Sequence, residues 1–117
     1  MVRAMSLRNC PVKVTVDVIG GKWKPLILYF LKNGPQRFNA LQRLMPEATR
    51  KMLTQQLKEL ERDDIVARTV LRKMPPHVEY SMSSHGKALQ TILGHMARWG
   101  IEHRDKYQRL RRISLSA

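Results

Sequence analysis

The stretch TRKMLTQQLKELERDD, residues 49–64, has the apolar spacing of an amphipathic helix. At 100° per residue, its mostly apolar side is predicted to face the protein core. That side consists of Thr49, Leu53, Leu57 and Leu60, flanked by Met52 and Gln56. Thr49 is also a suitable N-cap, because its hydroxyl can accept a hydrogen bond from a backbone amide of the first turn. The sequence therefore predicts a helix that begins at Thr49.

The opposite side of this helix is basic and rich in amide groups, with Glu59 and Glu61 on its flanks. Lys and Arg can pair with phosphates or guanine, Gln can bind adenine at two points, and a Thr methyl can contact thymine. Because residues near a helix start reach bases first, Lys58 and Arg62 are assigned to the DNA backbone. The residues assigned to bases are Arg50, Lys51, Thr54 and Gln55. A merely solvated helix face is the alternative.

Two apolar helices are predicted before this stretch. KWKPLILYFLKNGP (22–35) carries an apolar stripe and ends at a Gly-Pro pair, and RFNALQRLMPEA (37–48) repeats the pattern at smaller scale until Pro46. Two short helices joined by three or four residues describe a helix-turn-helix. Arg37, at the start of the shorter helix, is predicted to join the DNA contacts.

A basic hairpin is predicted after the helix. The β-branched run IVARTVL (65–71) and the alternating VEYSM (78–82) favour two antiparallel strands around the tip RKMPPH. With the helix-turn-helix, these are the parts of a winged helix. Arg72, Lys73 and His77 are then expected to contact phosphates or a minor groove. An exposed hairpin with solubilising charges is the alternative.

The two ends of the chain are less clearly patterned. VKVTVDV (12–18) alternates like a half-buried strand, whereas Pro11, Gly20-Gly21 and the spacing of its apolar residues fit a helix, so both interpretations stay open. From Ser83 or Ser84 a further helix is predicted through Leu110, with fraying after it. Its apolar stripe consists of Leu89, Ile92, Leu93, Met96 and Trp99.

Composition restricts the class of protein. The 117 residues suit one domain, and 22 Lys and Arg against 9 Asp and Glu give a net charge of +13, which favours a polyanionic partner. The longest apolar run, PLILYFL (25–31), is far below the roughly 18 residues of a membrane span, and the start lacks a secretory signal. A soluble, cytoplasmic protein is expected. The four histidines are scattered and no phosphate loop occurs, so no enzyme activity, metal site or cofactor is predicted.

Five motifs occur in a fixed order across about residues 9–103. They are CPVKVTVDVIGGKWKPLIL (10–28), RFNAL (37–41), KMLTQQLKELERDDIVARTV (51–70), PPHVEYSMSSHGKAL (75–89) and the Trp99-Gly100 pair. Together they resemble the HxlR-type transcriptional regulators, a MarR-like winged helix-turn-helix family of bacteria. One departure is Glu47, which stands in the turn where the family often has glycine.

The resemblance implies an α+β, mainly α fold: a winged helix-turn-helix with N- and C-terminal dimerisation helices. It makes residues 11–19 helical rather than extended. It also divides the chain into a flexible N-terminus (1–9), a winged helix-turn-helix domain (10–103) and a basic C-terminal extension (104–117).

The resemblance further implies a dimer interface formed by the first and last helices. Met96 and Trp99 would fit an intramolecular core equally well. The interface residues are Val12, Val16, Leu89, Ile92, Leu93, Met96 and Trp99.

The function that the resemblance implies is that of a homodimer bound to a pseudo-palindromic double-stranded DNA operator, with repression as the usual outcome and the cytoplasmic nucleoid as its location. The competing class is an RNA-binding or ribosome-associated basic protein, although RNA readers usually expose aromatic residues and those here fall mostly on apolar stripes. A membrane role for 104–117 is disfavoured by its small apolar surface.

Cys10 is the single cysteine. Some members of the family sense electrophiles or oxidants through an N-terminal cysteine at this place, so a thiol-reactive or small-molecule effector is expected, of unidentified nature. Arg8 and Lys13 beside a helix start would favour the reactive thiolate. An inert cytosolic thiol is the alternative.

Overall fold

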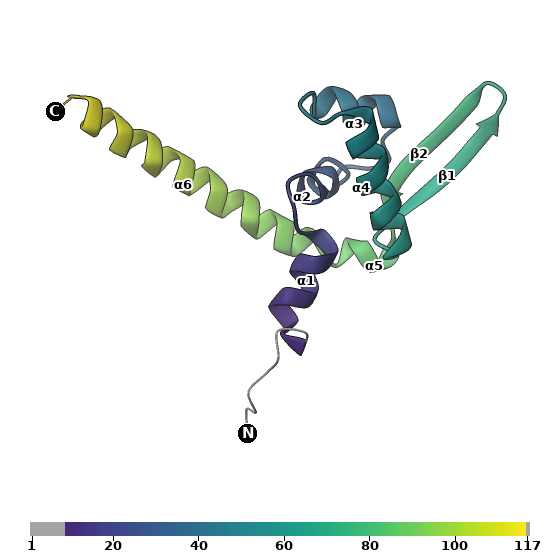
Figure 1. Ribbon diagram of the computed structural model, residues 1–117, viewed down its shortest axis with the longest axis horizontal. Coiled ribbons are helices and arrows are strands. Elements are labelled where there is room, and N and C mark those ends of the chain that lie inside the picture. Colours follow the sequence, from purple (N-terminus) through teal and green to yellow (C-terminus); the bar gives the residue numbers. More distant parts are fainter. Residues whose placement is uncertain (1–8, 117) are drawn as a thin grey trace.

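The computed structural model describes the backbone of residues 9–116 and the side chains of residues 9–109; residues 1–8 of the predicted flexible N-terminus lie outside that range. Helices and one two-stranded antiparallel sheet make up the described chain (Figure 1). This mixture confirms the predicted mainly α, winged helix-turn-helix fold. In chain order the elements are α1 (Pro11–Ile19), α2 (Lys24–Phe30), α3 (Phe38–Leu44), α4 (Arg50–Arg62), β1 (Val66–Lys73), β2 (Pro76–Met82), α5 (Ser84–Lys87) and α6 (Gln90–Ser116).

Residues 12–18 belong to α1, which confirms the helix over 11–19 that the family resemblance implies and excludes the strand that the alternating valines left open. Pro11 occupies the first turn, where its fixed φ suits a helix and its missing N–H is not needed. At the other end, Gly20 donates its N–H to the carbonyl of Val16. The valines of α1 are mostly exposed, and within residues 9–116 no strand pairs with this segment, so the helix itself satisfies the backbone groups.

The core lies between α2, α3, α4 and the base of the wing. Its fully buried side chains are Ile27, Leu28, Leu31, Leu41, Leu53, Leu57 and Leu60. The three leucines of α4 confirm its predicted inner face. Thr49 and Met52, assigned to the same face, are instead exposed. The Thr49 hydroxyl accepts from the backbone N–H of Met52 at 3.1 Å, which confirms the predicted N-cap.

The wing is the predicted antiparallel hairpin. Its register runs from Val66 opposite Met82 to Lys73 opposite Pro76, with a shift between Val70 and Arg72. Gln36 and Tyr80 exchange two backbone hydrogen bonds of 2.8 Å, which tie β2 to the segment that precedes α3. The wing is therefore held beside the helix-turn-helix at its base, while its tip projects away from the helices (Figure 1).

The helical segment after the wing is divided in two, because Ala88 and Leu89 form a turn between α5 and α6. Helix α6 continues to Ser116, beyond the predicted end near Leu110, and has no break at residues 103 and 104. It projects on the side opposite the wing (Figure 1). Among the described residues, no helix combines the length and apolar character needed to cross a bilayer.

Candidate nucleic-acid interface

The turn between α3 and α4, residues 45–49, is stabilised by hydrogen bonds from a side chain of α3 to its backbone. Gln42 Nε2 donates to the carbonyl oxygens of Ala48 at 2.5 Å and Met45 at 3.4 Å, and both of these residues are buried. Glu47 is exposed. Within the described residues, Asp64 is the only residue other than glycine that has a positive φ, so Glu47 does not have one. The turn therefore forms with ordinary backbone at Glu47 and does not require glycine there.

The side of α4 opposite its leucines is exposed at every position that the sequence assigned to DNA. Three of these side chains, Lys51, Thr54 and Lys58, form no side-chain hydrogen bond or ion pair with the part of the chain that the structure describes. They are available to a partner outside the chain. The exposed set is Arg50, Lys51, Thr54, Gln55, Lys58 and Arg62.

Arg50 lies against α3. Its Nη1 donates to Asn39 Oδ1 at 3.3 Å, and its guanidinium carbon is 4.5 Å from the centre of the Phe38 ring, a cation–π contact. These contacts join the start of α4 to the start of α3. Arg50 therefore helps to orient the two helices in addition to supplying charge near the predicted base-reading end.

A partly buried ion pair lies at the edge of the exposed face of α4. Lys24, 6% exposed, donates from Nζ to Glu59 Oε1 at 2.7 Å, and Gln55 Nε2 donates to Glu59 Oε2 at 2.9 Å. The hydrogen bond from Lys24, followed by that from Gln55, lowers the pKa of Glu59 below its ordinary value. Glu59 is therefore ionised at neutral pH, although it lies at the edge of a face proposed to meet an anion.

Sequence reasoning missed this pair. Lys24 and Glu59 are separated by 35 positions, and neither local periodicity nor a motif connects them. The one available signal was a lysine in the first turn of an otherwise apolar helix, since a buried lysine requires a partner.

The C-terminal end of α4 carries a second ion pair. Arg62 Nε lies 3.3 Å from Asp63 Oδ1, and this hydrogen bond raises the pKa of Arg62 above its ordinary value. The Arg62 side chain is still mostly exposed. Its charge is partly offset by its neighbour, in contrast to those of Lys51 and Lys58.

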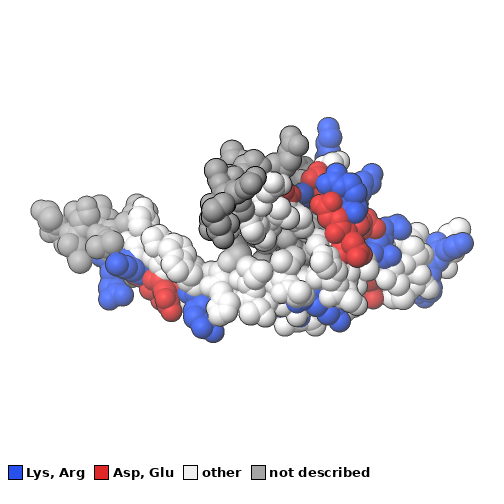
Figure 2. Space-filling view, turned by 90° about the horizontal axis from the view of Figure 1, so that it is seen from below, with Lys and Arg blue, Asp and Glu red and all other residues white. Residues whose placement is uncertain are grey.

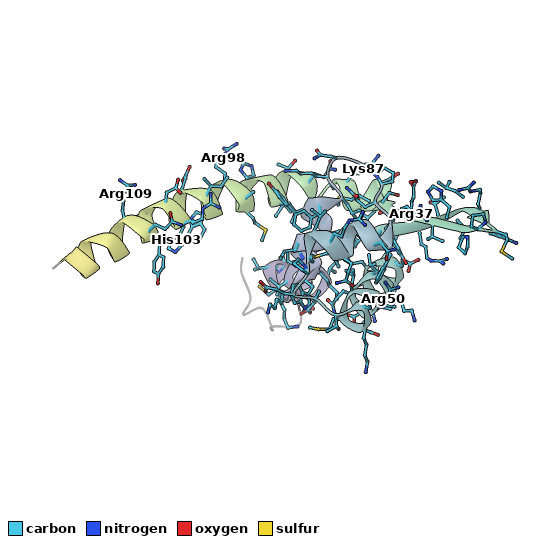
Figure 3. All side chains as sticks on the ribbon, turned by 90° about the horizontal axis from the view of Figure 1, so that it is seen from above. Arg37, Arg50, Lys87, Arg98, His103 and Arg109 are labelled. Atoms are coloured by element: carbon cyan, nitrogen blue, oxygen red, sulfur yellow. The ribbon has the colours of Figure 1, made fainter. Side chains whose placement is uncertain are left out.

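The wing presents its predicted residues unequally. Arg72 and Lys73 are exposed near the tip, whereas the His77 side chain is 25% exposed and its Nε2 lies 3.5 Å from Glu79 Oε2. Arg37 Nη2 donates to the Pro76 carbonyl at 3.3 Å and so connects α3 to β2. Figure 3 places Arg37 and Arg50 on the half of the molecule that carries the wing.

The residues predicted for a dimer interface fall into two groups. Leu93 is buried and Leu89 packs against the core, so both belong to the core of this chain. Met96 and Trp99 are 50% and 65% exposed, which excludes them from that core. The exposed members are Val12, Val16, Ile92, Met96 and Trp99.

Charged side chains are unevenly distributed over the face of the molecule that Figure 2 shows. Figure 2 shows Lys and Arg at the wing end and on the far part of α6, with mostly uncharged surface between them. Figure 3 places Arg98, His103 and Arg109 along α6, away from the wing. The described cations of α6 are therefore spatially separate from those of α4 and the wing.

Cys10 directly precedes α1 and is partly exposed. Lys13, expected to act on its thiol, forms a 2.7 Å ion pair with Asp17 instead, and Arg8 lies outside the described residues. In residues 9–109, no group of three or more His, Cys, Asp or Glu side chains is arranged to hold a metal ion.

Residues 18–108 match the family model described as HxlR-like helix-turn-helix. The HTH-type transcriptional regulator YdeP of Bacillus subtilis (strain 168) is 46% identical over 102 residues, which cover 87% of this chain and 80% of that protein. Redox regulator HypR in its reduced form superposes with a TM-score of 0.80 at 47% identity, over 84% of this chain and 97% of that one. Its oxidised form gives 0.77 at 48% identity, over 80% and 96%. The chain belongs to the HxlR-like helix-turn-helix family of transcriptional regulators.

Proposed function

We propose that the protein binds double-stranded DNA sequence-specifically as a homodimer and represses transcription from a neighbouring promoter. The observation that carries this proposal is the outward face of α4, which is exposed along its length and has no carboxylate at its centre. It lies beside a wing that exposes Arg72 and Lys73. Major-groove base edges and the phosphates beside them are the partner that such a polar, cationic face complements.

The proposal divides the contacts between bases and backbone. Lys51, Thr54 and Gln55 read base edges, with Arg50 beside them at the start of α4. Phosphates are contacted by Lys58 and Arg62 and, from the neighbouring elements, by Arg37, Arg72, Lys73 and His77. Arg37 and His77 have the smaller share, because each already lies against another group of the chain.

The exposed apolar residues of α1 and α6 support a homodimer. Burying Val12, Val16, Ile92, Met96 and Trp99 against a second copy would remove from water a surface that a single chain leaves exposed. A twofold dimer presents two α4 helices to successive major grooves, about 10 base pairs apart, so the operator is pseudo-palindromic. Residues 10–103 form the regulatory domain in this proposal, and 104–117 a basic extension. Such a regulator acts at the nucleoid, in the cytoplasm.

Two alanine variants test the assignment against a duplex that the protein selects from a randomised library. Gln55→Ala is expected to weaken binding and to relax the preference at one base position on the order of tenfold. Lys73→Ala should weaken all duplexes alike and reduce the slope of log affinity against log salt by about one. Lys106→Ala, which removes an exposed charge from α6, is the control. If both test variants bind like the parent protein in gel-shift titrations, the assigned face is wrong.

The same titrations distinguish DNA from RNA as the partner. A structured RNA of equal length should displace the selected duplex poorly, because the outward face of α4 suits a major groove that A-form RNA makes too narrow. Displacement by equimolar RNA would favour the RNA-binding alternative.

We further propose that Cys10 makes the regulator responsive to thiol oxidants. HypR, a redox regulator by its name, is 48% identical to this chain, and Cys10 is partly exposed next to α1. A peroxide would oxidise the thiolate to a sulfenic acid, and a second thiol would displace water from it to form a disulfide. Because each chain has one cysteine, that thiol comes from the second copy or a small molecule.

Hydrogen peroxide tests this sensor, with Cys10→Ser as the matched control. Operator binding of the wild-type protein should change on oxidation and recover with a reductant, while that of Cys10→Ser should not change. An equal response of the two proteins would rule out Cys10 as the sensor.

A further inference from the structure

Three side chains form a hydrogen-bonded row from the core to the outward face of α4. Lys24 Nζ donates to one carboxylate oxygen of Glu59 at 2.7 Å, and Gln55 Nε2 donates to the other at 2.9 Å. Exposure increases along the row: the Lys24 side chain is 7% exposed, that of Glu59 25%, and Gln55 is exposed. The row therefore connects the buried start of α2 to a side chain that faces the proposed DNA.

The carboxylate determines the orientation of the Gln55 amide. An amide presents donors on its nitrogen and acceptors on its oxygen, whereas an ionised carboxylate only accepts. The Gln55 amide has two orientations that differ by a 180° flip. Glu59 favours the one in which Gln55 Nε2, and not Oε1, faces its carboxylate. Lys24 supports this selection, because it donates to the other carboxylate oxygen of Glu59 at 2.7 Å and so holds the carboxylate in place. The same hydrogen bond lowers the pKa of Glu59.

We propose that Glu59, anchored by Lys24, is the positioning residue that fixes the Gln55 amide for reading adenine. The inference rests on the proposed DNA-binding function. With one Nε2 hydrogen given to Glu59, Gln55 retains its Oε1 acceptor and a second N–H donor. Adenine offers the matching N6 donor and N7 acceptor in the major groove, while guanine offers two acceptors and leaves Oε1 without a donor. An orientation fixed before binding also removes a rotation that the complex would otherwise have to freeze.

Base preference at the position read by Gln55 tests the proposal. The wild-type protein selects a duplex from a randomised library, and each base pair of that duplex is then substituted in turn. The position where Gln55→Ala and wild type differ most is the one that Gln55 reads. There, Glu59→Gln should lower the preference for adenine on the order of tenfold, with preferences elsewhere unchanged. Adding Gln55→Ala to Glu59→Gln should cause little further loss, because both act through one contact.

Glu61→Gln is the matched control. It removes the same charge from the same helix, and Glu61 has no side-chain hydrogen bond or ion pair within residues 9–109. A general gain in DNA affinity from losing a carboxylate should appear in both variants, whereas the loss of adenine preference should appear in Glu59→Gln alone.

A double variant covers the case in which Glu59→Gln does not fold, because that change leaves the Lys24 ammonium buried without its counter-ion. Lys24→Met with Glu59→Gln removes the ion pair entirely and should show the same loss of adenine preference. Both variants are first compared with wild type by circular dichroism.

The possible outcomes separate the two proposals. Wild-type adenine preference in the Glu59 variants, at the position where Gln55→Ala loses it, would overturn the positioning role and leave DNA binding intact. Weakened preference at every position would also overturn it, since a general loosening of α4 would then be the cause. If Gln55→Ala changes no position, the base contact of the proposed function fails, and the positioning role fails with it.

Discussion

Leu57 of α4 and Trp99 of α6 are both large apolar residues on helices of mixed polarity, yet they are 1% and 65% exposed. Around Leu57, the helices α2 and α3 and the base of the wing complete a core within one chain. Around Trp99 the described residues provide no such cover, and every residue from 98 to 109 is exposed. Apolar periodicity thus identifies the side of a helix that needs a partner, but not whether that partner belongs to the same chain.

The difference assigns different roles to the two regions. The helix-turn-helix and wing carry contacts that fix their geometry internally, such as Arg50 on Phe38 and Arg37 on Pro76. Helix α6 extends from the domain with Ile92, Met96 and Trp99 exposed. Near the middle of this helix, the rings of Trp99 and His103 stack with their centroids 4.7 Å apart. The first region is complete as a single chain, whereas the second is complete only in the proposed dimer.

The largest expected effect is on the free energy of unfolding, from a substitution in the core of the helix-turn-helix. Leu57→Ala should reduce the free energy of unfolding by about 2–5 kcal/mol, because it removes a fully buried side chain and leaves a cavity. Leu44→Ala, at a site 47% exposed on α3, is the control and should change it by less than about 1 kcal/mol. Urea denaturation monitored by circular dichroism measures both. Equal losses would mean that exposure in one chain does not identify the core.

Trp99→Ala tests the region that is incomplete. If Trp99 is buried against a second copy, its removal should weaken association by about 2 kcal/mol or more, while the helical content at high protein concentration is retained. Sedimentation equilibrium gives the dissociation constant. Leu71→Ala, at a wing residue 52% exposed, should leave it unchanged. If Trp99→Ala leaves the dissociation constant of the dimer unchanged, Trp99 is not buried against a second copy, and α6 is not completed by dimerisation.

The features that could be predicted from the sequence are the ones that depend on residues close together in the chain. The leucine face of α4, the Thr49 cap and the hairpin depend on residues close together in the chain, and these predictions are confirmed. For α1, alternation favoured a strand, but Pro11 and Gly20 at its ends fit the helix that forms. A strand needs a neighbouring strand to satisfy its backbone hydrogen-bonding groups. The described residues provide no such neighbour for residues 12–18, so the alternation of their side chains does not produce a strand.

The details that the sequence did not predict are contacts between distant segments. The Lys24–Glu59 pair joins two helices, and Arg50 lies against Phe38 of the preceding helix. Such contacts depend on how α2, α3 and α4 pack, which no single segment encodes. The exposed positions of α4 were predicted as a group, but the hydrogen bond that holds Gln55 to Glu59 required the packed structure.

A smaller effect is expected at the cap of α4. Thr49→Ala should reduce the free energy of unfolding by about 1 kcal/mol, because the N–H of Met52 loses its acceptor at 3.1 Å. Thr54→Ala, at an exposed site inside α4 without a side-chain partner in the described chain, should not lower it, because alanine has the higher helix propensity. Thermal or urea unfolding distinguishes the two variants. If they lose equal stability, the hydroxyl of Thr49 does not cap the helix.

The smallest expected effect is a pH dependence. Hydrogen bonds from Lys24 and Gln55 hold the pKa of Glu59 in the folded chain below its ordinary value of 4.5. The ionised pair with Lys24 therefore contributes its full stabilisation above that ordinary value. The contribution is then lost as the pH falls from about 4.5 through the lower folded value. The free energy of unfolding is measured by urea denaturation at a series of acidic pH values for the wild type and for the double variant Lys24→Met with Glu59→Gln. Comparing the two proteins cancels the effect of the other carboxylates, which titrate in both. Their difference should shrink on acidification.

Protein concentration links this last measurement to the comparison of regions. Lys24 and Glu59 lie within the part that one chain completes, so the difference between wild type and double variant should be the same at low and high concentration. A difference that grows with concentration would show that the pair also supports association. In that case the helix-turn-helix and wing would also contribute to the stability of the dimer. These elements and α6 would then unfold and associate as one cooperative unit.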